Sequence, residues 1–149
     1  MVDNIRKTTG RVLAVDFGDT RTGLAVSDSG RFLASGLGYV SPGGIVKTAD
    51  AVAVRARELG VSAVVVGLPV NMNGTEGARA GRCREFADLL AERLPGVAID
   101  MVDERLTTME AARYLNATDT RGKKRKGVID SLAAEIILQS TLDRLKNGT

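Results

Sequence analysis

The sequence contains no histidine, no tryptophan and a single cysteine, Cys83, among its 149 residues. The absence of histidine excludes imidazole general acid–base catalysis, Ser-His-Asp and Cys-His nucleophile systems, and imidazole metal ligands. A single cysteine excludes a disulfide framework within the chain and a zinc site built from several cysteines. Any hydrolytic chemistry must therefore use carboxylates, lysine, tyrosine or a bound metal ion.

Aromatic residues and long apolar runs are also scarce. The aromatic residues are Phe17, Phe32, Phe86, Tyr39 and Tyr114. So few rings argue against a protein that stacks single-stranded bases on an aromatic platform. No stretch approaches the roughly 18 apolar residues of a membrane span, and the polar start does not resemble a signal peptide. We expect one cytoplasmic domain over 1–149 without membrane contact, in which 1–10 and 116–127 are flexible.

The formal net charge of +3 is unevenly placed. Residues 120–149 hold seven Lys and Arg against three acids, a surplus of four, so the other 119 residues sum to −1. Most of this surplus lies in the run Arg-Gly-Lys-Lys-Arg-Lys at 121–126. Such a run can follow a phosphate backbone, or it can be a solvated loop. Composition alone leaves both interpretations open.

The apolar periodicity predicts strands and helices in a definite order. Strands are expected at 12–15, 24–27, 32–40, 61–68 and 97–102, and helices at 45–59, 78–94, 106–115 and 128–145. Three strands in a meander, followed by alternating helices and strands, predict an α/β protein. Its mixed five-stranded sheet would have helices on both faces. This is the order of the ribonuclease H-like architecture.

Three acidic positions stand out in that arrangement. Asp16 ends the first strand, Glu104 follows the fifth beside Asp103, and Asp130 lies in the first turn of the last helix. They would converge if the last helix packs across the sheet beside the first strand. Clustered carboxylates bind Mg²⁺ or Mn²⁺, and a metal pair can activate water and stabilise a leaving oxygen.

Each of these acids also has a simpler explanation. Asp16 would then cap a solvated turn. The triplet 103–105 would be a surface ion pair, and Asp130 would only complement the helix dipole.

Four segments carry a resemblance to a known family. Val15–Ala25, Val66–Thr75, Asp103–Thr108 and Lys124–Ala134 resemble, in this order, the motifs of the bacterial YqgF/RuvX family. Its members are ribonuclease H-like nucleases implicated in maturing the 5′ end of pre-16S ribosomal RNA, and are also described as Holliday junction resolvases. Asp19 departs from the family pattern, in which a lysine or a small residue is familiar. This extra acid could oppose the approach of a phosphate or add a metal ligand.

The resemblance implies a two-metal-type endonuclease that uses Mg²⁺ or Mn²⁺. Asp16, Glu104 and Asp130 take the positions of the catalytic, metal-binding acids, with Asp103 as an alternative middle ligand. The positions implied to contact nucleic acid are Arg21, Asn71, Arg105, Lys123, Lys124, Arg125 and Lys126. The substrate would be structured RNA or branched DNA.

Two other functions are weighed against the nuclease. One is a non-catalytic ribosome-assembly factor that binds nucleic acid through the same basic run. The other is an actin-type ATPase, which would need a second domain that this chain is too short to hold. The chain is expected to be a monomer or a homodimer, and a junction resolvase would need the dimer.

Overall fold

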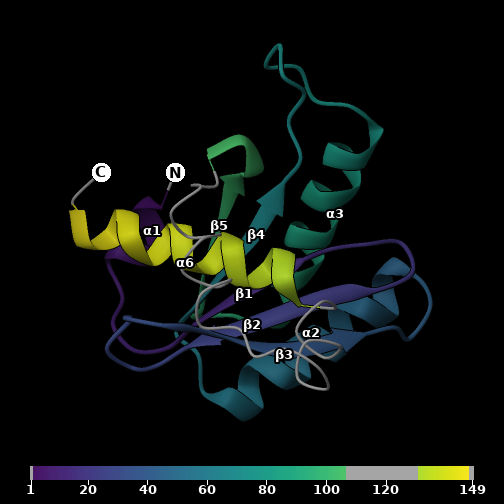
Figure 1. The fold of residues 1–149 in the computed structure, drawn as a ribbon. Helices are drawn as coiled ribbons and strands as arrows, with labels where there is room; N and C mark the ends of the chain where they lie inside the picture. Colours follow the sequence, from purple (N-terminus) through teal and green to yellow (C-terminus); the bar gives the residue numbers. More distant parts are fainter. Residues whose placement is uncertain (1, 107–130, 148–149) are drawn as a thin grey trace, which may run out of the picture.

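A five-stranded mixed sheet forms the centre of the computed structural model, which describes residues 2–106 and 131–147 (Figure 1). In spatial order the strands are β3 (Ala34–Val40), β2 (Thr22–Ser27), β1 (Val12–Asp16), β4 (Ala63–Leu68) and β5 (Ala98–Asp103). β2 pairs antiparallel with both β1 and β3, whereas β4 pairs parallel with both β1 and β5. The predicted α/β class and mixed five-stranded sheet are therefore confirmed.

Helices cover both faces of this sheet (Figure 1). They are α1 (Asp3–Arg6), α2 (Ile45–Leu59), α3 (Ala78–Arg93), the one-turn 3₁₀ helix η1 (Glu104–Leu106) and α6 (Leu132–Asn147). α2 and α3 pack on the face that receives Leu13 and Val15 of β1, while α1 and α6 pack on the face that receives Val12 and Ala14. Successive side chains of a strand point to opposite faces, so β1 contributes to two cores. No helix in the described ranges is long and apolar enough to cross a membrane.

The limits of α2 agree with the sequence prediction, whereas the start of β3 differs from it. α2 begins and ends as predicted, between Gly44 and Gly60. The third strand begins at Ala34 instead of Phe32, because the backbone N–H groups of Phe32 and Leu33 both donate to Asp28 Oδ1, at 2.8 and 2.9 Å. A carboxylate thus takes the donors that would otherwise extend the strand.

Residues 3–6, expected within a flexible segment, instead form the short helix α1. The backbone N–H of Ile5 donates to Asp100 Oδ2 at 2.9 Å, and Asn4 Nδ2 donates to Asp100 Oδ1 at 2.8 Å. Ile5 is fully buried against the α6 face of the sheet. The start of the chain is therefore attached to β5 by hydrogen bonds and by apolar burial.

The last described helix, α6, has the position on the sheet that convergence of the predicted acids requires. Its apolar side chains Ala134, Ile137 and Leu138 share a core with Val12 and Ala14 of β1. The helix therefore packs across the sheet over the first strand. The predicted helix at 106–115, beyond Leu106, and the segment 116–127 lie outside the described residues.

α6 approaches β3 closely at Gly36. A Cβ atom at this glycine would overlap both Glu135 Oε1 and Ser131 Oγ, which are buried side chains at the start of α6. Ser131 Oγ donates to Glu135 Oε1 at 3.2 Å, so neither atom can move independently of the other. Only a residue without a side chain lets the helix lie this close to the edge strand.

We expect Gly36→Ala to lower the free energy of unfolding by about 1–3 kcal/mol, because the buried side chains of Glu135 and Ser131, or the helix start that carries them, must move to admit the methyl group. Gly81→Ala provides the matched control. Gly81 lies in α3, and a Cβ there meets nothing within 4 Å. This substitution should stabilise the protein by about 0.4–1 kcal/mol. Urea unfolding of both variants checks the pair, and equal stability of Gly36→Ala and wild type would contradict the close approach.

Candidate active site

Two carboxylates meet at the carboxyl ends of the parallel strands. Asp16 is the last residue of β1, and Glu104 directly follows β5. β4 lies between these two strands, with Val15 paired to Val66 and Gly67 paired to Val102. The carboxyl edge of parallel strands is where ligands bind in open α/β sheets. The strand order therefore brings Asp16 and Glu104 to opposite sides of one central strand, at its functional end.

Gly67 leaves the space that Glu104 occupies. A Cβ atom at Gly67 would lie 3.2 Å from Glu104 Oε2 and 2.7 Å from Ile137 Cδ1 of α6. The Glu104 carboxylate therefore lies over the backbone of β4, on the face covered by α6. Asp16 is two residues beyond Ala14, whose side chain packs on this same face, so the alternation along β1 directs Asp16 to it as well.

Neither carboxylate makes a hydrogen bond or ion pair within the described residues, and both are only partly exposed. Burial raises the pKa of Asp16, and the nearby charge of Arg79 partly opposes this rise. Burial also raises the pKa of Glu104, the negative charge of Asp16 adds to the rise, and Arg79 again opposes it. The effect of the Asp16 charge on the pKa of Glu104 agrees with the position of both acids at the same edge of the sheet. They form a pair of desolvated oxygen donors.

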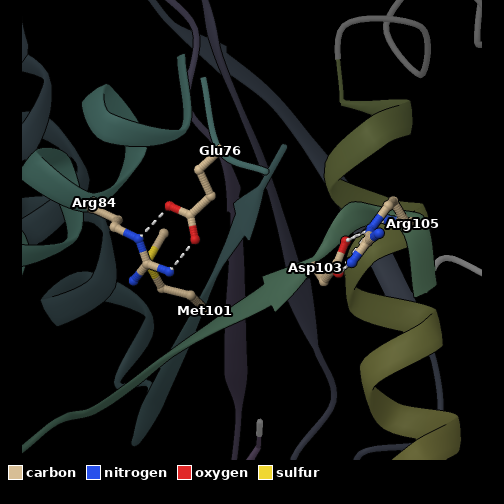
Figure 2. A network of polar contacts seen from close by, with 5 residues as sticks. All are labelled: Glu76, Arg84, Met101, Asp103 and Arg105. Carbon is tan, nitrogen blue, oxygen red and sulfur yellow. Dashed lines mark hydrogen bonds and ion pairs between the residues drawn. The ribbon is translucent and has the colours of Figure 1, made fainter. Parts of the chain in front are cut away.

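Asp103 is placed differently from Glu104. Its carboxylate accepts hydrogen bonds from Arg105 Nη2 at 2.7 Å and Arg105 Nε at 3.0 Å, and from the Arg105 backbone N–H at 2.9 Å (Figure 2). These contacts, led by the side-chain hydrogen bond, hold the pKa of Asp103 below its usual range. The predicted ion pair in the 103–105 triplet exists, and it occupies Asp103. Glu104 is left as the acid of this turn that has no partner among the described residues.

The predicted nucleic-acid contacts are distributed around this edge. Arg105 is held by Asp103, and the guanidinium of Arg21 lies 4.7 Å from the centre of the Tyr39 ring. Asn71 Nδ2 donates to Thr75 Oγ1 at 3.0 Å and so stabilises its own loop. The third predicted acid, Asp130, and the basic residues Lys123, Lys124, Arg125 and Lys126 lie outside the described residues.

The loop after β4 stands beside the two carboxylates and is internally connected. Val70 and Glu76 form an isolated bridge, and the backbone N–H of Asn71 donates to Thr75 O at 2.8 Å. Glu76 also accepts two hydrogen bonds of 2.7 Å from Arg84 of α3 (Figure 2). The loop is therefore attached to α3 and projects beyond the sheet (Figure 1).

Arg79 is a functional candidate that sequence reasoning missed. It lies in the first turn of α3, and its Nη2 donates to the carbonyl oxygen of Phe17 at 2.8 Å. The sequence does predict a helix that begins just after the β4 loop. The first turn of such a helix lies at the carboxyl edge of the sheet, which was the available signal.

The donor set at this edge fits a hard divalent cation. Mg²⁺ and Mn²⁺ prefer carboxylate oxygens and water, and Asp16 and Glu104 supply carboxylates that no other described side chain occupies. In residues 2–106 and 131–147, no three acids or cysteines gather into a metal-binding group. The described part of the site is thus a pair of acids.

We expect Asp16→Asn to stabilise the metal-free protein at pH 7 but not below pH 3.8. A pKa raised by folding means that the folded state binds the proton more tightly than the unfolded chain. The resulting stability is complete below the ordinary pKa of 3.8 and is lost as the pH rises through the raised value. An asparagine at this position has no charge, so its burial causes no such loss of stability as the pH rises.

Urea unfolding in EDTA at both pH values measures this difference. Asp88→Asn, which removes an exposed carboxylate of α3, should not show this change between the two pH values. A less stable Asp16→Asn protein at pH 7 would mean that the Asp16 carboxylate is satisfied in the fold.

Comparisons with known proteins agree with this architecture. The family model described as RuvX, Holliday junction resolvase, matches residues 10–144. A candidate pre-16S rRNA nuclease of Rhodospirillum centenum is 43% identical over 143 residues, covering 93% of this chain and 76% of the relative. A second, from Caldanaerobacter subterraneus, is 42% identical over 139 residues, covering 93% of this chain and 99% of the relative.

Solved structures share the fold at low sequence identity. RuvC of T. thermophilus, in complex with a Holliday junction substrate, has a TM-score of 0.63 at 18% identity, covering 94% of this chain and 97% of that chain. The Fowlpox virus resolvase, also in complex with Holliday junction DNA, has a TM-score of 0.52 at 8% identity, covering 92% and 97%. The match over nearly the whole length and the level of identity to the curated relatives show that this chain belongs to the RuvX family.

Proposed function

We propose that this chain is an endonuclease, dependent on Mg²⁺ or Mn²⁺, that hydrolyses phosphodiester bonds in structured nucleic acid. The observation that carries the proposal is a pair of carboxylates, Asp16 and Glu104, that lie at the carboxyl edge of β1 and β5 and have no partner among the described residues. Family membership supports the same activity, because relatives over most of the chain are named as nucleases. The absence of histidine from the whole sequence leaves carboxylates and metal as the most economical catalytic set.

The chain's own residues would perform four tasks in this reaction. Asp16 and Glu104 would hold the metal, and Asp130 is proposed as a third ligand. Gly67 keeps the space over β4 open for Glu104. Asp103 engages Arg105 and thereby fixes the turn that presents Glu104. Burial under α6 limits the water around the carboxylates. When bound, the metal activates the attacking water and stabilises the charge of the leaving oxygen.

Pre-16S rRNA is the substrate that we propose first, because the curated relatives carry it in their names, and its 5′ end is the cleavage region that the family resemblance implies. A four-way DNA junction is the second candidate, favoured by the description of the family model. The basic residues Lys123, Lys124, Arg125 and Lys126, together with Arg21, Asn71 and Arg105, are proposed to contact the nucleic acid. Resolution of a junction would need two sites and therefore a dimer.

Cleavage assays test the proposal directly. Purified protein is incubated with a pre-16S RNA that retains its 5′ leader and with a four-way DNA junction, each with Mn²⁺ and with EDTA. Asp16→Asn and Glu104→Gln should each lower the rate by about a hundredfold or more, because a metal contributes several kcal/mol to the stability of the transition state. Asp88→Asn should cleave at the wild-type rate.

Binding of the metal has a separate measurement. A divalent ion that binds only the folded state raises the melting temperature by mass action. We expect Mn²⁺ to raise it in the wild type and not in the Asp16→Asn, Glu104→Gln double variant. No cleavage of either substrate, combined with intact RNA binding, would instead favour a ribosome-assembly factor without catalysis.

A further inference from the structure

We propose that Arg79 binds a phosphate of the substrate beside the two carboxylates, as a cation that the fold positions without neutralising it. The inference deepens the proposed function and rests on it. It identifies a substrate-binding residue outside the motifs that indicate the family.

The anchor of Arg79 is a fixed and uncharged group. Arg79 Nη2 donates to the carbonyl oxygen of Phe17 at 2.8 Å. Phe17 directly follows Asp16, and its buried ring stacks on Phe86 with a centroid distance of 4.7 Å. The carbonyl is therefore held by the core of the protein. Arg79 reaches it from α3, on the opposite face of the sheet from α6, so the guanidinium lies at the edge where the carboxylates are found.

Three other arginines near this edge are held by carboxylates instead. Arg105 is paired with Asp103, and Arg84 makes two hydrogen bonds of 2.7 Å to Glu76 (Figure 2). Arg82 Nε lies 3.8 Å from Asp19 Oδ1, and Arg82 Nη1 lies 3.4 Å from Glu85 Oε1. Asp19, the acid that departs from the family pattern, thus has a cation of its own. No carboxylate of the described residues lies within ion-pair distance of Arg79, whose one hydrogen bond there is to Phe17.

This difference affects how readily each arginine can receive a phosphate. A guanidinium has five N–H donors in a planar fork that matches two phosphate oxygens. One donor group of Arg79 is used by the Phe17 carbonyl, and the residue as a whole is exposed. A carbonyl acceptor fixes the position of the guanidinium without neutralising its positive charge. By contrast, Arg84 and Arg105 would have to exchange a carboxylate for the phosphate.

The charge of Arg79 acts on both members of the carboxylate pair. It opposes the rise in the pKa of Asp16 and of Glu104 that their burial causes. A phosphodiester that approaches two ionised carboxylates is repelled, and a cation at the same edge offsets this repulsion. The same cation also repels a divalent metal. Removal of Arg79 should therefore weaken the binding of nucleic acid and strengthen the binding of metal.

Arg79→Gln tests both effects, with Arg57→Gln as the matched control. Arg57 is an exposed arginine of α2 whose Nη1 donates to the carbonyl of Arg93 at 3.1 Å, so its loss removes the same charge and the same type of hydrogen bond. Binding of the pre-16S RNA is measured in EDTA over a series of salt concentrations. Binding of Mn²⁺ is measured by calorimetry without RNA.

For Arg79→Gln we expect RNA affinity to fall about tenfold at low salt, and the slope of log K against log salt to fall by about 0.7–0.9. Mn²⁺ should bind several-fold more tightly. Arg79→Lys should retain the wild-type salt slope while it loses part of the affinity, because lysine keeps the charge and lacks the planar fork. Arg57→Gln should match the wild type in all three measurements.

Unchanged RNA affinity and salt slope in Arg79→Gln would overturn the inference, even if the variant melted at a lower temperature. Arg79 would then only attach α3 to β1. Failure of the nuclease function is a different result, in which the wild type cleaves neither RNA nor DNA in Mn²⁺. Because the binding assays contain EDTA, a loss of RNA affinity in Arg79→Gln would still support the phosphate contact in that case.

Discussion

The parallel pairing of β1, β4 and β5 is the constraint on which the rest of the site depends. Asp16 and Glu104 are far apart in the chain, and only the register of these three strands brings them to one edge. That register is strongly specified, because Ala63, Val64, Val65 and Val66 of β4 are all fully buried between two layers of helices. A shift of one residue would exchange the two faces of β4 and would remove Gly67 from beneath Glu104.

The pair of acids is retained at a cost to the folded state. Three other acids of the described residues have partners, since Asp100 accepts two hydrogen bonds from α1, and Asp103 and Glu76 each bind an arginine. Asp16 and Glu104 have no such partner within the described residues, and burial raises the pKa of each of these carboxyl groups. Destabilising groups of this kind are typical of functional sites, where the fold supports an arrangement that stability alone would not favour.

Much of the architecture could be predicted from the sequence, because it depends on local periodicity. Gly44 and Gly60 bound an apolar stripe of helical period, and α2 has the predicted limits. The start of β3 could not be predicted, because it depends on Asp28 taking two backbone donors across a turn. Likewise, the sequence names both Asp103 and Glu104. The guanidinium of Arg105 occupies the first of them and leaves Glu104 without a partner among the described residues, and this contact is visible only in three dimensions.

The proposed phosphate contact and the proposed metal ligands come from different elements of the fold. The carboxylates belong to β1 and to the turn after β5, on the face packed by α6. Arg79 belongs to α3, on the other face. The loop after β4 is attached to the same helix through the Glu76–Arg84 ion pair. The hydrogen bond from Arg79 to the Phe17 carbonyl joins these two parts of the site, because Phe17 directly follows Asp16 at the end of β1. The proposed phosphate contact would therefore keep a fixed distance from the first proposed metal ligand, as hydrolysis of a positioned bond requires.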